Sequence, residues 1–476
     1  MVFSSPIFLF IFLPLVLAGY FVTRGRLRNL WLLGMSLVFY GWGEPRFVAI
    51  MLASIAANFG FGIWLDRVRG RPGARFLLAI AIALNLGLLV LYKYAAFLAG
   101  NANAALTLIG ASPMQLPAFA LPLGISFYTF HALSYLVDVS RRAADGQRDP
   151  AAMGLYIVFF PQLIAGPIIR YRDIADQLVH RIVTREIFAR GVQRFIIGLG
   201  KKMLIANTVA VPADAIFALP TSELTWGLAW LGIVCYTLQI YFDFSGYSDM
   251  AIGLALLFGF RFPENFNYPY IARSMTEFWR RWHISLSTWF RDYVYVPLGG
   301  NRRGPARTYL NLWLVFFLCG LWHGAAWTFV AWGLYHGSFL VLERLGLGRW
   351  LEGLWSPARH AYTMLAVMVG WVFFRAESLR QAGGYLSAMA GFASGSGLEQ
   401  HVGLQLNAIV ALALAAGALG SAPLLPRLAR WRSDIPTVKT RVLVEAGRLA
   451  GLAVLFVASA MLMAAGTYNP FIYFRF

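Results

Sequence analysis

The chain has 476 residues, of which 59% are hydrophobic and only 13% are charged. Soluble domains carry about 25% charged residues, so this composition excludes an ordinary soluble protein. The net charge of +19 would suggest a nucleic-acid ligand in a soluble protein. In a membrane protein, basic residues instead gather in cytoplasmic loops and against anionic lipid headgroups. We therefore expect the lipid bilayer as a partner and no nucleic acid.

Several apolar runs reach the roughly 20 residues that cross a hydrocarbon core. These runs are continuous, whereas membrane β-strands alternate apolar and polar residues, so the sequence predicts an all-α polytopic membrane protein. Gly320 and Gly324 are expected to divide one long run into two elements. The expected spans cover residues 6–23, 28–43, 46–65, 76–98, 118–138, 226–241, 247–260, 308–342, 361–375, 404–425 and 447–466.

The distribution of arginine predicts the orientation of the first five spans. Arginine clusters follow the first, third and fifth spans, whereas the 99–117 loop has no charged residue. Basic loops stay in the cytoplasm, so we expect the N-terminus outside. The N-terminal segment lacks a basic region and a cleavage site, and is expected to be a retained span. Residues 426–449 are predicted to be a basic cytoplasmic connector.

Two apolar segments carry residues that break helices. Segment 151–169 is flanked by arginines on both sides and contains Pro161, Gly166 and Pro167. Irregular backbone at membrane depth survives only inside protein or beside water, so this segment is predicted to be re-entrant. Glycines and lysines at 198–202 are predicted to interrupt the 192–206 run in a similar way. Loops are short throughout, and we expect one integral membrane domain over residues 1–476.

The stretch FWRRWHISLSTWFRDYVYVPLGGNRRG (278–304) is too charged to cross a bilayer and too aromatic for an ordinary loop. Treated as one helix, residues 277–293 place the aromatics on one side and the arginines on the other. This pattern predicts an amphipathic helix at the cytoplasmic interface. His283 falls beside Trp279 and Phe290, away from the arginine face, and is expected to point into the protein. The alternative is an interfacial histidine with no functional role.

A second stretch, LCGLWHGAAWTFVAWGLYHG (318–337), places His323 in an apolar run. An ionisable residue inside a membrane is costly and marks a functional site by default. The alternative for His323 is a neutral imidazole hydrogen-bonded to a nearby carbonyl group. His336 is expected near the membrane edge, where a structural role is favoured.

A third stretch, YTLQIYFDFSGYSDMAIG (236–253), contains Asp243 and Asp249 with Ser245 between them. Unpaired carboxylates would be expensive in these surroundings. They are expected to orient a histidine, pair with an arginine or stabilise a polar kink, and a purely structural hydrogen-bond cluster is the alternative. No metal-binding or nucleotide-binding motif is present. Histidine is therefore the best candidate base for activating a hydroxyl or thiol at neutral pH.

These residues resemble the membrane-bound O-acyltransferase family, and most closely its bacterial branch that O-acetylates exopolysaccharides. The resemblance rests on signature blocks within about residues 1–380 and, less strongly, on the terminal GTYNPFIYFRF. The blocks are MVFSSPIFLFIFLPL, LPLGISFYTFHALSYLVDVSR, FFPQLIAGPIIRYRD, YFDFSGYSDMAIGLALLFGFRFPENFNYPY, TEFWRRWHISLSTWFRDYVYVPLGGNR, LWHGAAWTFVAWGLYHG and WVFFRA.

The resemblance implies a ring of about 11 transmembrane helices, with re-entrant and interfacial helices, around a thin central tunnel. It implies that His323 is the catalytic histidine and that His283 is the second signature polar residue. Asp243, Asp249 and Ser245 would form a supporting polar site. Arginine binds phosphates bidentately, so a basic aromatic face could attract a phosphate-bearing donor; the alternative, which explains these arginines equally well, is binding to lipid headgroups. The residues expected there are Arg280, Arg281, Trp282, Arg302 and Arg303.

The predicted function is O-acetyl transfer at the bacterial inner membrane. The resemblance implies a cytoplasmic thioester donor, most simply acetyl-CoA, and no bound cofactor or metal. It also implies separate periplasmic proteins that complete the esterification of a polysaccharide such as alginate or cellulose. Two alternatives remain open: D-alanyl transfer from a carrier protein toward teichoic acid, and a non-enzymatic transporter. Transporters commonly contain inverted repeats, and none is evident in the sequence.

Overall fold

The structure is a computed structural model, and it describes residues 1–115, 119–393, 395–397, 400–433 and 437–470. All regular elements within these ranges are helical. The final residues of the terminal motif, 471–476, and the first residue of the predicted 118–138 span lie outside the described residues. Contacts divide the chain into two compact units. Unit 1 comprises residues 1–191, 251–263 and 324–326, and unit 2 comprises residues 192–250, 264–323 and 327–476.

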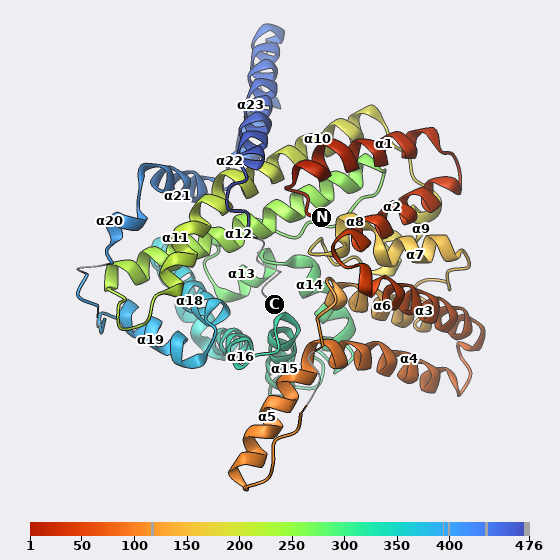
Figure 1. Ribbon diagram of the computed structural model, residues 1–476, viewed down its shortest axis with the longest axis horizontal. Helices are drawn as coiled ribbons and strands as arrows, with labels where there is room; N and C mark the ends of the chain where they lie inside the picture. Colours follow the sequence, from red (N-terminus) through yellow and green to blue (C-terminus); the bar gives the residue numbers. More distant parts are fainter. Residues whose placement is uncertain (116–118, 394, 398–399, 434–436, 471–476) are drawn as a thin grey trace. The chain divides into compact units, whose positions relative to one another are not determined.

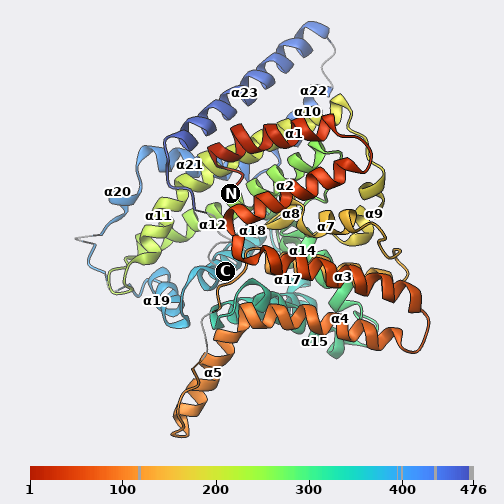
Figure 2. The same cartoon turned by 45° about the vertical axis from the view of Figure 1, so that its right-hand side comes forward.

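Unit 1 is built from pairs of neighbouring helices, in which α2 packs against α7 and α6 packs against both α3 and α4. The α4 helix continues through a π-helical turn into α5, which bends away from it (Figures 1 and 2). The unit contains η1 (Phe8–Phe12), α1 (Leu13–Val22), α2 (Leu27–Gly43), η2 (Pro45–Phe47), α3 (Val48–Val68), α4 (Ala74–Leu89), η3 (Val90–Tyr94), α5 (Ala95–Leu108), α6 (Ile125–Ser140), α7 (Pro150–Val158), α8 (Phe160–Leu163) and α9 (Tyr171–Val179).

Unit 2 is organised around the antiparallel pair α15 and α16, with α18 and α13 packed against α16. The helices α10 (Arg185–Gly200) and α12 (Trp226–Leu257) contribute residues to both units. The remaining elements are η4 (Lys201–Ala206), α11 (Asn207–Ala218), η5 (Pro269–Ile271), α13 (Met275–Arg281), α14 (Ile284–Phe290), η6 (Arg291–Tyr295), α15 (Pro305–His323), α16 (Trp327–Leu342), η7 (Glu343–Leu347), α17 (Gly348–Glu352), α18 (Ser356–Arg375), α19 (Leu379–Met389), α20 (Val402–Gln405), α21 (Ala408–Gly420), α22 (Leu424–Ser433) and α23 (Val438–Ala464).

Five helical segments among the described residues are long and apolar enough to cross a membrane. They are Pro45–Val68, Ala74–Leu108, Arg185–Ala218, Trp226–Leu257 and Val438–Ala464. Two predictions about these segments are wrong. The spans expected at 226–241 and 247–260 form one helix, α12. The interruption expected at 198–202 is only a π-helical turn inside a continuous helix, because Gly198 is needed for a close approach to Gly246 and not for a break.

The predicted interruption of the 151–169 segment is confirmed. The α7 helix ends at Val158, the short α8 covers Phe160–Leu163, and the chain from 167 to 170 is not helical. Proline cannot continue a hydrogen-bonded helix, and Pro161 lies at the start of α8. The segment is buried from Ala152 to Ile169, which agrees with irregular backbone being shielded by protein.

The prediction of a single amphipathic helix over residues 277–293 is wrong. The α13 helix ends at Arg281, and α14 begins at Ile284. His283 lies between them with φ 44° and ψ 54°, a left-handed conformation that is uncommon for residues other than glycine. The aromatic side chains of this region, including Phe278 and Trp282, are buried in unit 2 and do not form an interfacial stripe. The break changes the direction of the chain at the histidine.

The expected division of residues 308–342 is confirmed, since α15 ends at His323 and α16 begins at Trp327. Gly320 has a different role from the one predicted. A Cβ at Gly320 would lie 2.3 Å from the carbonyl oxygen of Phe329, and a Cβ at Gly333 would lie 2.3 Å from that of Phe316. The two glycines therefore allow the backbones of α15 and α16 to touch, and this contact fixes where α15 places His323.

Candidate functional site

Two histidines predicted from separate stretches of sequence meet inside unit 2. The ring centroids of His283 and His323 are 6.4 Å apart. The two residues are buried, with 1% and 6% of their surface exposed. His283 comes from the break between α13 and α14, whereas His323 comes from the C-terminal end of α15. The structure thus brings together the two residues that the sequence singled out most strongly.

Aromatic side chains form the walls around His323. The ring of Trp332 on α16 lies 5.1 Å from the His323 ring, and that of Phe374 on α18 lies 5.2 Å away. Trp371, one turn before Phe374, packs on Trp282 at 4.9 Å. The WVFFRA block therefore supplies walls for the histidine site, a role that the sequence did not reveal. Such apolar walls lower the local dielectric and strengthen polar interactions within the site.

His283 is held by one residue that sequence reasoning missed, Asn265. The Asn265 side-chain oxygen lies 3.0 Å from His283 Nδ1, and it accepts hydrogen bonds from the Ser285 backbone N–H at 3.3 Å and from the Ser285 hydroxyl at 2.9 Å. The Asn265 backbone oxygen accepts from the Ile284 N–H at 2.9 Å. Asn265 therefore satisfies N–H groups at the start of α14 that the helix itself leaves unpaired.

An ionic network lies directly beside this cluster. The Arg194 guanidinium donates to Asp249 at 2.9 Å and to Glu264 at 2.5 Å, and Lys201 pairs with Asp249 at 2.7 Å. Of the expectations for Asp249, pairing with an arginine is confirmed. Glu264 directly precedes Asn265, so the network ties the Asn265 segment to α12.

Asp243 forms a buried ion pair with Lys202 at 2.7 Å, and the two side chains are 1% and 4% exposed. Lys202 also donates a hydrogen bond to the carbonyl oxygen of Pro470. Ser245 is buried on the same helix, α12. The supporting polar residues therefore lie in the interior of unit 2, where an unpaired charge would be costly.

The residues expected to attract a phosphate-bearing donor occupy different environments. Arg280 and Arg302 are exposed, as is Arg303. Arg281 pairs with Glu277 at 2.9 Å, whereas Trp282 is buried against Trp371. Only the exposed arginines are available to a soluble anion, so Trp282 contributes to the wall of the histidine site instead of to an external surface.

The break that presents His283 depends on how α13 begins. The Glu343 carboxylate accepts hydrogen bonds from the N–H groups of Met275 and Thr276, at 2.6 and 2.9 Å. A carboxylate is favourable at a helix N-terminus. The Ser274 hydroxyl caps the same end by accepting from the Glu277 N–H. These contacts fix the start of the short helix that leads to His283.

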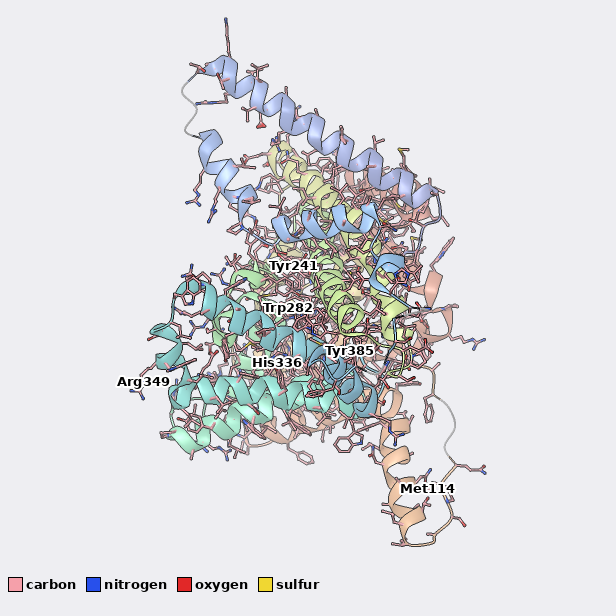
Figure 3. The ribbon with its side chains drawn as sticks, turned by 90° about the vertical axis from the view of Figure 1, so that its left-hand side faces the viewer. Met114, Tyr241, Trp282, His336, Arg349 and Tyr385 are labelled. Carbon is pink, nitrogen blue, oxygen red and sulfur yellow. The ribbon has the colours of Figure 1, made fainter. Side chains whose placement is uncertain are left out.

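Two further histidines are buried outside the pair. His336 was expected near the membrane edge, but it is completely buried and its ring packs on those of Trp279 and Trp332. Figure 3 shows His336 and Trp282 within the side chains of unit 2, whereas Arg349 points outward. A helical wheel could not reveal this, because burial depends on α18 covering α16.

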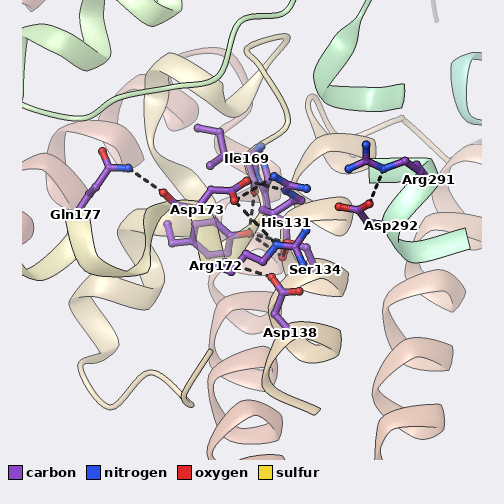
Figure 4. A network of polar contacts seen from close by, with 11 residues as sticks. His131, Ser134, Asp138, Ile169, Arg172, Asp173, Gln177, Arg291 and Asp292 are labelled. Carbon is purple, nitrogen blue, oxygen red and sulfur yellow. Dashed lines mark hydrogen bonds and ion pairs between the residues drawn. The ribbon is translucent and has the colours of Figure 1, made fainter. Parts of the chain in front are cut away.

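In unit 1, His131 belongs to a separate polar network (Figure 4). Its Nε2 accepts a hydrogen bond from the Ile169 N–H at 3.4 Å, and the Tyr156 hydroxyl bonds to the carbonyl oxygens of both residues. Near it, Asp138 accepts from the Arg172 N–H at 3.2 Å. These contacts join α6 to the non-helical chain after α8 and to the start of α9, and they satisfy backbone groups there, which is a structural role.

Burial determines the protonation state of His283. Removal from water lowers the pKa of His283 to about 3, because desolvation disfavours the charged imidazolium. The ring is therefore neutral at physiological pH. A ring with so low a pKa is a weak general base, but a neutral imidazole beside a second histidine can form a hydrogen bond that orients a polar reactant.

Comparison with known proteins identifies the family of the chain. The family model of the membrane-bound O-acyltransferases matches residues 74–374, a range that includes both histidines. The chain belongs to the membrane-bound O-acyltransferase family. Membership makes the protein an acyltransferase, and the apolar helices make it a multi-pass membrane protein.

Three relatives within this family show how far the similarity extends. The chain is 44% identical to the probable alginate O-acetylase AlgI of Pseudomonas putida, over the full length of both chains. It is 36% identical to the peptidoglycan O-acetyltransferase of Helicobacter pylori, over 82% of this chain and 80% of that protein. It is 30% identical to the teichoic acid D-alanyltransferase of Bacillus subtilis, over 53% of this chain and 66% of that one.

Proposed function

We propose that this membrane-bound O-acyltransferase takes an acetyl group from a cytoplasmic thioester, acetyl-CoA, and delivers it toward O-acetylation of an exopolysaccharide such as alginate or cellulose. The observation that carries the proposal is the buried pair of His283 and His323, within a chain that matches alginate O-acetylases from end to end. The protein would act in the inner membrane, with helices surrounding a thin tunnel. Separate periplasmic proteins would complete the transfer to the polymer.

In the proposed reaction His323 is the general base. It removes the proton from an acceptor hydroxyl, whose oxygen attacks the carbonyl carbon of the thioester. The C–S bond breaks, an ester forms, and the thiolate of coenzyme A takes the proton from the imidazolium. His283 would position the donor or stabilise the developing oxyanion. An acetyl-histidine intermediate, in which His323 itself attacks the thioester, is a second route with the same overall balance.

The remaining polar residues would act on the site from outside it. Asp243 and Asp249, held by Lys202 and Arg194, would keep the polar interior ordered. The exposed Arg280 and Arg302 would raise the local concentration of an anionic donor. Arginine is suited to this task because its planar guanidinium binds phosphate groups bidentately.

Acetyl transfer is favoured over D-alanyl transfer by the extent of the similarity. The full-length relatives are named as alginate O-acetylases, whereas the D-alanyltransferase matches only 53% of this chain. The deciding experiment offers purified protein a hydroxyl acceptor together with either acetyl-CoA or a D-alanyl carrier protein and measures release of the free thiol. We expect release from acetyl-CoA alone.

The same assay tests the role of His323 and the transporter alternative. His323→Ala should lower the rate of thiol release by about 10²- to 10⁴-fold, the usual contribution of a positioned acid or base. His360→Ala, at a half-buried histidine on α18, is the matched control. A folded His323→Ala protein that still transferred acetyl groups at the original rate would refute the proposed chemistry.

A further inference from the structure

We propose that Asn265 is a positioning residue that holds the His283 imidazole in the tautomer protonated on Nδ1, so that Nε2 is the hydrogen-bond acceptor of this ring. The catalytic use of His283 rests on the proposed function. The tautomer itself follows from the contacts around Asn265 and can be measured without any activity.

The argument begins with the identity of the Asn265 atom that faces His283. This atom lies 3.3 Å from the backbone nitrogen of Ser285. A backbone N–H is always a donor, so its partner must be the amide oxygen and not the amide nitrogen. The opposite orientation of the amide would place two donors against each other. The assignment of the Asn265 oxygen is therefore fixed by the peptide backbone.

The identity of that oxygen decides the protonation of His283. An amide oxygen only accepts hydrogen bonds, and it lies 3.0 Å from His283 Nδ1. Nδ1 must therefore carry the proton that it donates. In a neutral imidazole only one nitrogen is protonated, so Nε2 has a lone pair. The burial of His283, with 1% of its surface exposed, keeps the ring neutral.

Asn265 is itself held in place from two sides. Its amide nitrogen donates to the Ser248 hydroxyl at 3.0 Å, and the neighbouring Glu264 and Asp249 are joined by Arg194. Residues 248–249 and 264–265 thus form two adjacent pairs. In each pair one residue belongs to the ionic network and the other to the Asn265 cluster. The amide cannot rotate without losing contacts at both of its ends.

This tautomer selects between the two roles proposed for His283. An oxyanion is stabilised by donors, and a neutral ring protonated on Nδ1 has no donor at Nε2. The ring can instead accept a hydrogen bond from an acceptor hydroxyl or from an amide N–H of the donor. Asn265 therefore directs His283 toward positioning a reactant and not toward stabilising the oxyanion.

The direct test is nitrogen NMR of protein labelled with ¹⁵N-histidine, because the two neutral tautomers and the imidazolium give different ring-nitrogen shifts. The His283 signals are assigned by comparison with His283→Gln, whose spectrum lacks them. We expect the wild-type His283 signals of a neutral ring protonated on Nδ1. In Asn265→Ala the preference for that tautomer should be lost. In Asn265→Asp the added carboxylate should favour the imidazolium.

Activity provides the second measurement. Loss of a residue that orients a metal-bound histidine typically costs about 10- to 100-fold in activity, and we expect Asn265→Ala to lower kcat by a similar factor. Asn265→Asp should move the acidic limb of the pH profile to higher pH. Asn311→Ala is the matched control, since Asn311 is also buried in unit 2 but, among the residues that the structure describes, its side chain donates only to the carbonyl groups of Leu298 and Gly300.

Each outcome decides the inference. It is supported if Asn265→Ala changes the His283 signals while Asn311→Ala leaves them unchanged. It is overturned if the wild-type ring is protonated on Nε2, or if the His283 signals are the same in wild type and a folded Asn265→Ala protein. A wild-type protein that transfers no acetyl group would refute the proposed function, but the spectra would still decide the role of Asn265.

Discussion

Gly320 offers a test of whether the spacing of the two histidines controls the reaction. It lies one turn before His323 and touches α16, yet it contributes no functional group. A Cβ added at Gly320 would lie 2.3 Å from the carbonyl oxygen of Phe329, whereas ordinary contacts begin at 3.4 Å. The obstructing atom belongs to the backbone and cannot rotate away. In Gly320→Ala the two helices must therefore separate by about 1 Å, as expected for an overpacked contact.

The magnitude of the effect follows from this displacement. Overpacking of a close contact costs about 1–3 kcal/mol of the free energy of unfolding, and the better helix propensity of alanine offsets about 1 kcal/mol of it. The protein should therefore remain folded. A displacement of about 1 Å at a reacting group can lower the rate by about 10²-fold. We expect kcat to fall by that factor, although the substituted residue touches no reactant.

The assay compares Gly320→Ala with Gly451→Ala. Gly451 lies on α23, where an added Cβ would meet no atom within 4 Å, so this control should keep its activity and its thermal stability. The measured quantities are the initial rate of thiol release from acetyl-CoA and the unfolding temperature in the same detergent. A folded Gly320→Ala protein with the original kcat would refute the idea that the contact between α15 and α16 sets the catalytic geometry.

Three other predictions concern the interior and the exposed basic residues. Lys202→Met should lower the free energy of unfolding by about 3–5 kcal/mol, because it removes the cation of a buried ion pair. Adding Asp243→Leu should restore most of that loss in denaturation experiments. A single variant no less stable than the double variant would contradict this. Glu343→Gln should destabilise the start of α13 by about 1–3 kcal/mol, measured by thermal unfolding; an unchanged unfolding temperature would argue against the cap. Arg280→Ala combined with Arg302→Ala should raise KM for acetyl-CoA at low salt and have little effect at high salt, with kcat unchanged; a salt-independent KM would exclude electrostatic attraction.

Hydropathy predicted the class of the protein and many of its helices, but not the continuity of several elements. The missed continuity of α12 has a physical cause. Asp243 and Asp249 lower the hydropathy in the middle of the helix, which suggests a break, yet both carboxylates are paired with cations from the segment 194–202. Two of these cations, Lys201 and Lys202, together with nearby glycines made the 192–206 run look interrupted. Each segment satisfies the charges of the other, and this complementarity is not visible in either segment alone.

His323 could be found from sequence because a histidine in an apolar run is costly and therefore informative, and His283 could be found because it lies away from the arginine face of its stretch. The residue that orients one of them could not be found in this way. Asn265 lies in PENFNYPY, an irregular stretch in which a polar side chain needs no special explanation. Its importance comes from its distance of 3.0 Å to a residue 18 positions later in the chain. Sequence patterns identify polar residues that are costly to bury more readily than they identify the hydrogen-bond partners of those residues.

The break at His283 links the fold to the proposed chemistry. A residue in the left-handed conformation costs about 1–3 kcal/mol, and ending a helix there also leaves the first N–H groups of α14 without partners inside the helix. The hydrogen bonds of Asn265 offset the strain at His283 and provide partners for these N–H groups. Its backbone oxygen accepts from Ile284, and its side chain accepts from Ser285 as well as from His283. A glycine would relieve the backbone strain but would supply no imidazole. The strained histidine is therefore retained together with the asparagine that stabilises the break, and the same contacts that cap α14 also set the tautomer of the ring facing His323.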